Sequence, residues 1–268
     1  MKREKIANEE TSIGICFVGL VSCTVANSVY ADDSSVQKGK VEFKVKDVQD
    51  IVDPEFPDRS VNPGPGPATE GPLRIDFISK FDFFENKISN KNETYYGNAQ
   101  LFLDDTSARG NFIQITDNRE TGSGWLLQVR QEHQLKEETK NIELDGAMVS
   151  LDYSWTNSWN NKSNSPTVSK DVIEIKNIGE VYNLASASKG AGEGTWLINF
   201  GASNQNEAGV EDTLSKRVDK NGKPIVDSTF NDKEVHQNRG LKLFVPGGTK
   251  KSPGSYQTTF TWILSELP

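Results

Sequence analysis

Two stretches of the chain alternate between large apolar and polar residues with the period of two that is typical of an extended strand. In residues 124–131 one face carries Trp125, Leu127 and Val129. In residues 256–268 the corresponding face carries Tyr256, Thr258, Phe260, Trp262 and Leu264. Both stretches contain Trp-x-Leu, a spacing that places an aromatic and an aliphatic side chain next to each other on one face of a sheet. We predict one β-strand at 125–131 and another at 256–264.

Shorter segments with strand-like composition recur along the chain and are separated by polar turns. The further predicted strands are 73–78, 99–103, 112–116, 147–155, 172–176, 195–200 and 241–245. Residues 203–239 are polar and predict a surface excursion, with Asn221-Gly222 as a hairpin turn and 213–217 as a short helical turn. Regular strand–turn spacing predicts an all-β fold, an antiparallel β-sandwich or barrel-like domain.

The N-terminal residues 1–31 have the layout of a secretory signal. Basic residues precede an apolar run at 13–25, and Val29-Tyr-Ala31 provides a small-residue cleavage site. The apolar run is short for a membrane span, so we expect no transmembrane segment in the mature chain. In an alternative interpretation, Leu20-Val-Ser-Cys23 is a lipobox and Cys23 is lipid-modified.

The next two segments differ in composition. Residues 32–46 contain an alternating stretch with Val41, Phe43 and Val45 on one face, which predicts an N-terminal strand. Residues 47–72 hold six of the eleven prolines, mixed with glycine and aspartate, which predicts a linker with little regular structure. We therefore expect the main β domain to span 73–268.

Overall charge restricts the partners. The net charge is −8, which is a poor match for nucleic acid and for long-range attraction to anionic wall polymers. Both cysteines, Cys16 and Cys23, lie in the N-terminal apolar stretch. We expect a mature protein without disulfides, held together by its core.

The ordered set of motifs resembles the WxL-domain family of Gram-positive cell-surface proteins, from about residue 72 to the end of the chain. The motifs that carry the resemblance are, in chain order, Phe112-Ile-Gln-Ile-Thr-Asp-Asn-Arg119, Gly122-Ser-Gly-Trp-Leu-Leu-Gln-Val129, Leu144-Asp-Gly-Ala-Met148, Gly194-Thr-Trp-Leu-Ile-Asn-Phe-Gly201, Val245-Pro-Gly-Gly-Thr249, Thr261-Trp-Ile-Leu-Ser265 and the final Pro268. The resemblance implies an extracellular location at the cell wall and non-covalent attachment to peptidoglycan. It also implies membrane-anchored WxL-interacting proteins or other WxL proteins as partners.

The candidate ligand-binding residues are aromatic and aliphatic. Trp125, Leu127, Trp262 and Leu264 could present an aromatic surface to a glycan, or all four could be core residues, and a buried Trp could also shape a ligand surface from beneath. Trp159 lies among Asn and Ser residues in a predicted loop, a setting suited to carbohydrate recognition. The alternative function is that of an interaction subunit, which binds an envelope partner or host matrix through the Trp-x-Leu face.

Other chemistry has weak support in the sequence. Arg239, Lys242, Lys250 and Lys251 form a local basic cluster that could meet phosphate or carboxylate, although a solvated turn is the simpler interpretation. His133 and His236 stand in unrelated contexts, and neither metal-ligand spacing nor a nucleophile motif is present. We expect no enzymatic activity, no cofactor and no metal. No Leu-Pro-x-Thr-Gly signal follows the last predicted strand, so we expect attachment without a covalent anchor.

Overall fold

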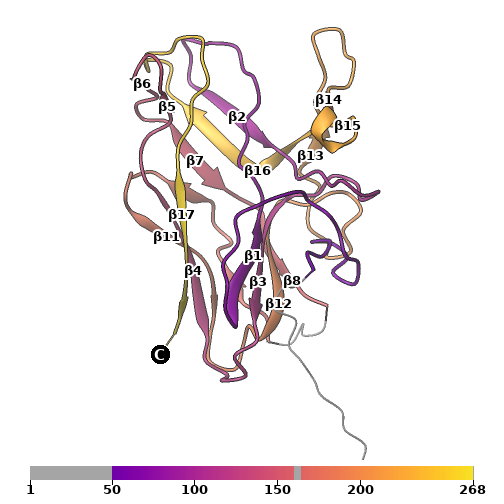
Figure 1. Ribbon diagram of the computed structural model, residues 1–268. Coiled ribbons are helices and arrows are strands. Elements are labelled where there is room, and N and C mark those ends of the chain that lie inside the picture. Colours follow the sequence, from indigo (N-terminus) through magenta and orange to yellow (C-terminus); the bar gives the residue numbers. More distant parts are fainter. Residues whose placement is uncertain (1–49, 160–163, 268) are drawn as a thin grey trace, which may run out of the picture. The chain divides into compact units, whose positions relative to one another are not determined.

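A computed structural model of the chain describes residues 50–159 and 164–267 (Figure 1). It confirms the predicted all-β class, because its elements are antiparallel strands and one short 3-10 helix, η1 (Ser228–Phe230). The described residues all lie in one compact unit. The predicted signal at 1–31 and the predicted strand at 32–46 lie outside the described residues.

Three antiparallel sheets make up the unit. The first has the order β1 (Leu73–Ile78), β3 (Asn111–Asp117), β12 (Gly194–Phe200) and β8 (Ser154–Asn157). The second has the order β10 (Ile173–Ile175), β7 (Met148–Leu151), β16 (His236–Val245) and β13 (Leu214–Lys216), with β2 (Glu93–Asn98) also paired to β16. The third has the order β17 (Phe260–Glu266), β4 (Trp125–Gln131), β11 (Val181–Ala187) and β9 (Thr167–Val168). Two hairpins complete the fold: β5 (Lys136–Glu137) with β6 (Ile142–Glu143), and β14 (Val226–Asp227) with β15 (Lys233–Glu234).

One hydrophobic core is shared by all three sheets. The first sheet contributes side chains such as Ile115 and Trp196, the second Leu151 and Leu241, and the third Leu127, all nearly inaccessible to solvent. Burial of apolar area contributes about 25 cal/mol per Å², so this shared core is the main source of stability. It also fixes which face of each strand points inward.

A second, smaller core lies on the other face of the first sheet. Phe77, Phe102, Phe112 and Leu197 form it, and Ile51, Val52 and Val61 pack against it. The regular structure in residues 50–61 is limited to one isolated bridge, between Val52 and Ser60. Low regular structure in this stretch therefore does not mean loose attachment, because it covers a sheet face. The exact domain boundaries stay predictions.

Two of the predicted strands are not single continuous strands in the structure. Residues 147–155 split into β7 and β8, which belong to different sheets, because the chain turns at Tyr153 (φ +53°). Residues 99–103 form only an isolated bridge between Gln100 and Arg109. Ala99, Leu101 and Phe102 are nevertheless buried, so the apolar pattern reported burial rather than strand pairing.

Other predicted elements differ in position or were missed. β2 and β11 were missed, because Tyr, Asn, Gly, Ala and Ser dilute their apolar pattern. Residues 214–216 are strand β13 rather than a helical turn. The last strand is shifted toward the C-terminus, to Phe260–Glu266. The Asn221-Gly222 turn is confirmed, with Gly222 at φ +80° and its N–H donating to Asp219 O.

Candidate functional site

The two Trp-x-Leu motifs lie on adjacent strands of the third sheet. β17 pairs antiparallel with β4 in continuous register, so that Leu264 is opposite Leu127 and Trp262 is opposite Val129. Directly opposed residues of an antiparallel pair project to the same face. Both motifs therefore point toward the shared core, and together they form one continuous patch on that face.

The first motif is entirely internal. Trp125 and Leu127 have no accessible surface, because β4 is flanked by β17 and β11 and its inner face packs on the core. The Trp125 indole N–H donates to Gly192 O (3.0 Å). Gly192 has φ +79°, and a Cβ at that residue would lie 2.5 Å from Trp125 Nε1. The loop that carries Gly192 is thus shaped around the ring.

The second motif is half-buried, because β17 is the last strand of its sheet. Trp262, Leu264 and Phe260 pack against the core but keep part of their surface accessible. Phe81, in the segment between β1 and β2, contacts both neighbouring rings edge-on, at 5.6 Å from Trp262 and 5.5 Å from Phe260 between ring centroids. We call Phe81, Phe260 and Trp262 the edge aromatic cluster.

The indole N–H groups separate the tryptophans into two kinds. Trp125, Trp155 and Trp196 each donate to a backbone carbonyl, at 3.0, 2.9 and 3.0 Å. Within 50–159 and 164–267, no residue accepts a hydrogen bond from Trp262 or Trp159. An indole that is buried usually has its N–H satisfied, so the lack of an acceptor among the described residues agrees with the partial exposure of Trp262 and the exposure of Trp159.

Trp159 is exposed, with 63 % of its surface accessible. It follows β8, in the first sheet, whereas the edge aromatic cluster belongs to the third sheet and the segment after β1. The five candidate residues therefore divide into three sets: an internal pair on β4, a half-buried pair on β17, and one exposed ring elsewhere.

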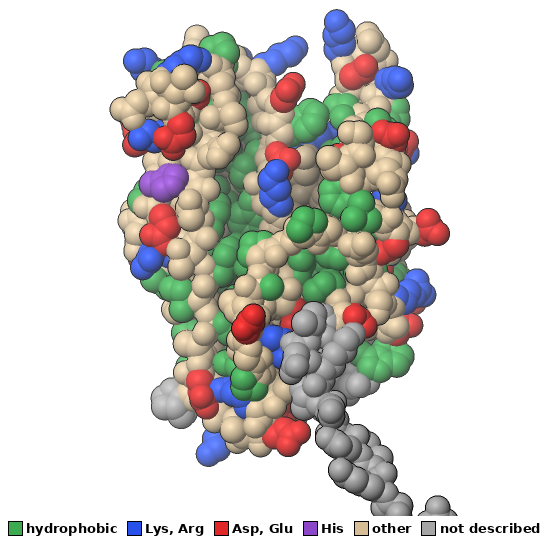
Figure 2. Space-filling model, viewed as in Figure 1, with side chains coloured by type: hydrophobic (Ala, Val, Ile, Leu, Met, Phe, Trp, Pro, Cys, Tyr) green, Lys and Arg blue, Asp and Glu red, His purple; other side chains and the backbone are tan. Residues whose placement is uncertain are grey.

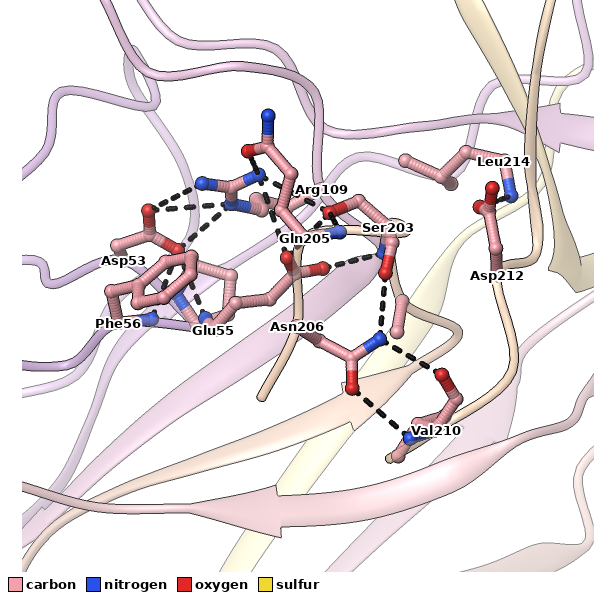
Figure 3. A network of polar contacts seen from close by, with 12 residues as sticks. Asp53, Glu55, Phe56, Arg109, Ser203, Gln205, Asn206, Val210, Asp212 and Leu214 are labelled. Atoms are coloured by element: carbon pink, nitrogen blue, oxygen red, sulfur yellow. Dashed lines mark hydrogen bonds and ion pairs between the residues drawn. The ribbon is translucent and has the colours of Figure 1, made fainter. Parts of the chain in front are cut away.

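A buried polar network, which sequence reasoning missed, attaches residues 53–55 to the domain (Figure 3). Arg109 donates from Nε and Nη2 to the two carboxylate oxygens of Asp53, at 3.0 and 2.9 Å, and Nη1 lies 3.4 Å from Glu55 Oε2. Glu55 in turn accepts from the backbone N–H of Ser203 (2.6 Å) and from its hydroxyl (2.5 Å). All three charged side chains are nearly inaccessible.

Burial raises the pKa of the Glu55 carboxyl above its usual range, and the hydrogen bonds from Ser203 and the charge of Arg109 only partly oppose this shift. The network joins segments far apart in the sequence, and no short motif announces it. The sequence feature that could have pointed to this network is the pair of acidic residues, Asp53 and Glu55, on either side of Pro54 in the predicted linker. A network closed on itself in this way has a structural role.

The predicted basic cluster is largely neutralised. Lys242 pairs with Asp152 (2.7 Å) and Arg239 with Glu211 (2.7 Å). The Lys251 ammonium donates to the carbonyls of Pro246 and Thr249. This arrangement favours the interpretation of a turn over that of an anion-binding patch.

A separate pocket of about 330 Å³ lies away from both motifs. Its lining combines apolar and charged side chains, among them Pro63, Phe77, Lys80, Asp82 and Phe230. Across the described ranges, no group of three or more His, Cys, Asp or Glu side chains could hold a metal ion. Likewise, no helix there is long and apolar enough to cross a membrane.

The fold is an all-β domain with a half-buried aromatic edge. The family described as WxL domain surface cell wall-binding matches residues 31–268, and the chain therefore belongs to the WxL family. Cell-wall binding and a location at the cell surface follow at the level of the family. No curated protein and no solved structure gives a significant match.

Proposed function

We propose that this chain binds peptidoglycan non-covalently and that the edge aromatic cluster contacts the ligand. The observation that carries the proposal is the partly accessible Trp262, whose indole N–H has no acceptor among the residues described and whose ring stands beside Phe81 and Phe260. Sugar rings stack on aromatic faces through their C–H edges, and the free N–H can donate to a hydroxyl or acetamido oxygen. Family membership supports wall binding in general.

The candidate residues take different roles in this proposal. Trp262 contacts the ligand and Leu264 flanks it on the same face. Trp125 and Leu127 are inaccessible, so they support β17 from the adjacent strand β4 and touch no ligand. Trp159 is an additional contact, at a second point on the molecule, because its ring is exposed among polar residues. No cofactor, metal or catalytic residue is part of the proposal.

The test is a pull-down of the purified protein on peptidoglycan stripped of proteins and teichoic acids. We expect Trp262→Ala to weaken binding about 2- to 10-fold, the range that corresponds to the loss of one aromatic contact. Trp159→Ala should weaken binding by a smaller factor. Phe84→Ala, which removes another exposed ring, is the matched control and should bind normally. Circular dichroism verifies that each variant is folded.

A second candidate function has its own supporting observation. The chain is then an interaction subunit that binds an envelope partner, such as a membrane-anchored WxL-interacting protein or another WxL protein, or host matrix. The supporting observation is that, in the part of the chain that the structure describes, β17 pairs with a strand on one side only. Failure of the unmutated protein to bind purified peptidoglycan would reject the first proposal and favour this one.

A further inference from the structure

Among the described residues, β17 has one edge paired with β4 and one edge without a paired strand. Glu132 N donates to Thr259 O, and Leu267 N donates to Gly124 O, both at 2.9 Å. In an antiparallel ladder, alternate residues direct their N–H and C=O groups to the partner strand. Thr261, Ile263 and Ser265 therefore bond to β4, whereas the intervening residues direct their backbone groups away from it. Those intervening residues are Phe260, Trp262 and Leu264.

The outward backbone groups have no partner among the residues of 50–159 and 164–267. Exposed strand edges are usually protected by proline, by lysine or by a bulge. β17 has none of these between Phe260 and Ser265, and its register with β4 is uninterrupted. The second Trp-x-Leu motif thus combines an inward-facing apolar row with an open set of hydrogen-bond donors and acceptors.

The edge is recessed. β1 approaches β17 without forming a ladder with it, and Phe81 reaches across to Phe260 and Trp262. Figure 2 shows a hollow with hydrophobic side chains along it, between the side that carries β17 and the side that carries β1 in Figure 1. The edge of β1 is itself closed at Ile75, whose N–H donates to the Thr69 hydroxyl and whose carbonyl accepts from Thr69 N.

We propose that the open edge of β17 is a strand-addition site for an extended segment of a partner polypeptide. The segment pairs with the backbone of Phe260, Trp262 and Leu264, and its alternate residues are apolar because they lie beside the inward-facing row. It has no proline at the paired positions. Its other residues are neutral or basic, which complements a chain of net charge −8.

The recess identifies the occupant as a single extended chain rather than a second copy of this protein. β1 and Phe81 flank the edge, so the sheet of another folded domain would meet them before it reached β17. Two copies, each with net charge −8, would also repel. This site shares Trp262 with the proposed peptidoglycan site, but it uses the backbone of that residue, whereas peptidoglycan binding uses the ring.

Amide hydrogen exchange measured by NMR tests the proposal, with an acetylated and amidated alternating Val-Lys peptide as the probe. In the free protein, the amides of Phe260, Trp262 and Leu264 should exchange faster than those of Thr261, Ile263 and Ser265. Added peptide should slow the first set about tenfold, as expected when each gains one hydrogen bond. First-set amides that are already protected in the free protein, or that stay unprotected with bound peptide, would overturn the proposal.

A pair of variants at one position isolates the backbone. Phe260→Pro removes an outward N–H without removing a bond to β4, at the first residue of the strand, where proline is tolerated. Phe260→Val removes the ring and keeps the N–H. We expect the proline variant to bind the peptide about tenfold more weakly than the valine variant, and equal affinities would contradict strand addition. Peptide binding that persists while the peptidoglycan pull-down fails would reject only the peptidoglycan proposal.

Discussion

Leu127 and Leu264, the aliphatic residues of the two Trp-x-Leu motifs, lie directly opposite each other on β4 and β17. Leu127 is inaccessible and Leu264 is half-buried, so the pair links the interior of the third sheet to its edge. The two motifs, 137 residues apart by their numbering (264 minus 127), thus form one structural unit. Because both strands place their apolar residues on the same inward face, the Trp-x-Leu spacing suits both motifs.

The pair predicts coupling between the two leucines. In a double-mutant cycle of Leu127→Ala and Leu264→Ala, we expect an interaction free energy of about 0.5–1 kcal/mol, the range for cross-strand neighbours. Urea unfolding of the two single variants and the double variant measures it. Strictly additive effects would mean that the two side chains do not support each other.

The two tryptophans of the motifs should respond differently to truncation. Trp125→Ala should lower the free energy of unfolding by about 3–5 kcal/mol, because it leaves a cavity in the core. Trp262→Ala should have a smaller effect, because part of that ring is already in contact with water. Urea denaturation gives both values, and equal losses would contradict the assignment of Trp262 to the edge.

Gly192 should be intolerant of a side chain. Gly192→Ala combines a φ of +79° with a Cβ only 2.5 Å from Trp125 Nε1 and 2.4 Å from Ala187 Cβ. Gly190→Ala is the matched control, since its φ is +80° and its Cβ would meet nothing within 4 Å. We expect Gly190→Ala to reduce stability by about 1–2 kcal/mol through backbone strain alone and Gly192→Ala by clearly more. Thermal unfolding of the two variants compares them.

Arg109 should be essential to the attachment of residues 50–61. Arg109→Met leaves two carboxylates buried beside it without their cation, and we expect a loss of about 3–5 kcal/mol in urea unfolding. Arg59→Met removes another guanidinium that stacks on Phe56, but Arg59 is exposed, so its loss should be below about 1 kcal/mol. Limited proteolysis should cut the Arg109→Met variant preferentially within 50–61.

The raised pKa of Glu55 predicts a pH dependence with a definite sign. Because the folded protein holds this proton more tightly than the unfolded chain, the contribution of Glu55 is fully present below pH 4.5, the ordinary pKa of its carboxyl. It is lost as the pH rises through the raised folded pKa. The stability of the unmutated protein relative to Glu55→Gln should therefore fall from acidic to neutral pH. Urea unfolding of both proteins across this range checks the sign, and a constant difference would contradict it.

The sequence alone determined the class of fold and the family resemblance, since both depend on local patterns. Period-two alternation identified β1 and β4 with their observed bounds, and the resemblance agrees with the family match over 31–268. Alternation also showed that Trp262 and Leu264 share a face. It could not show whether β17 is an edge strand, because a sheet's order depends on contacts between segments far apart in the chain.

The tertiary structure alone decided exposure and partnership. It placed Trp125 inside and Trp262 at the edge, although their local sequences are alike, because among the described strands β4 has neighbours on both sides and β17 on one. It also joined Asp53 and Glu55 to Arg109, which no local pattern connects. Periodicity reports which face of a strand is apolar, whereas burial and free hydrogen-bond groups depend on what the rest of the chain lays against that strand.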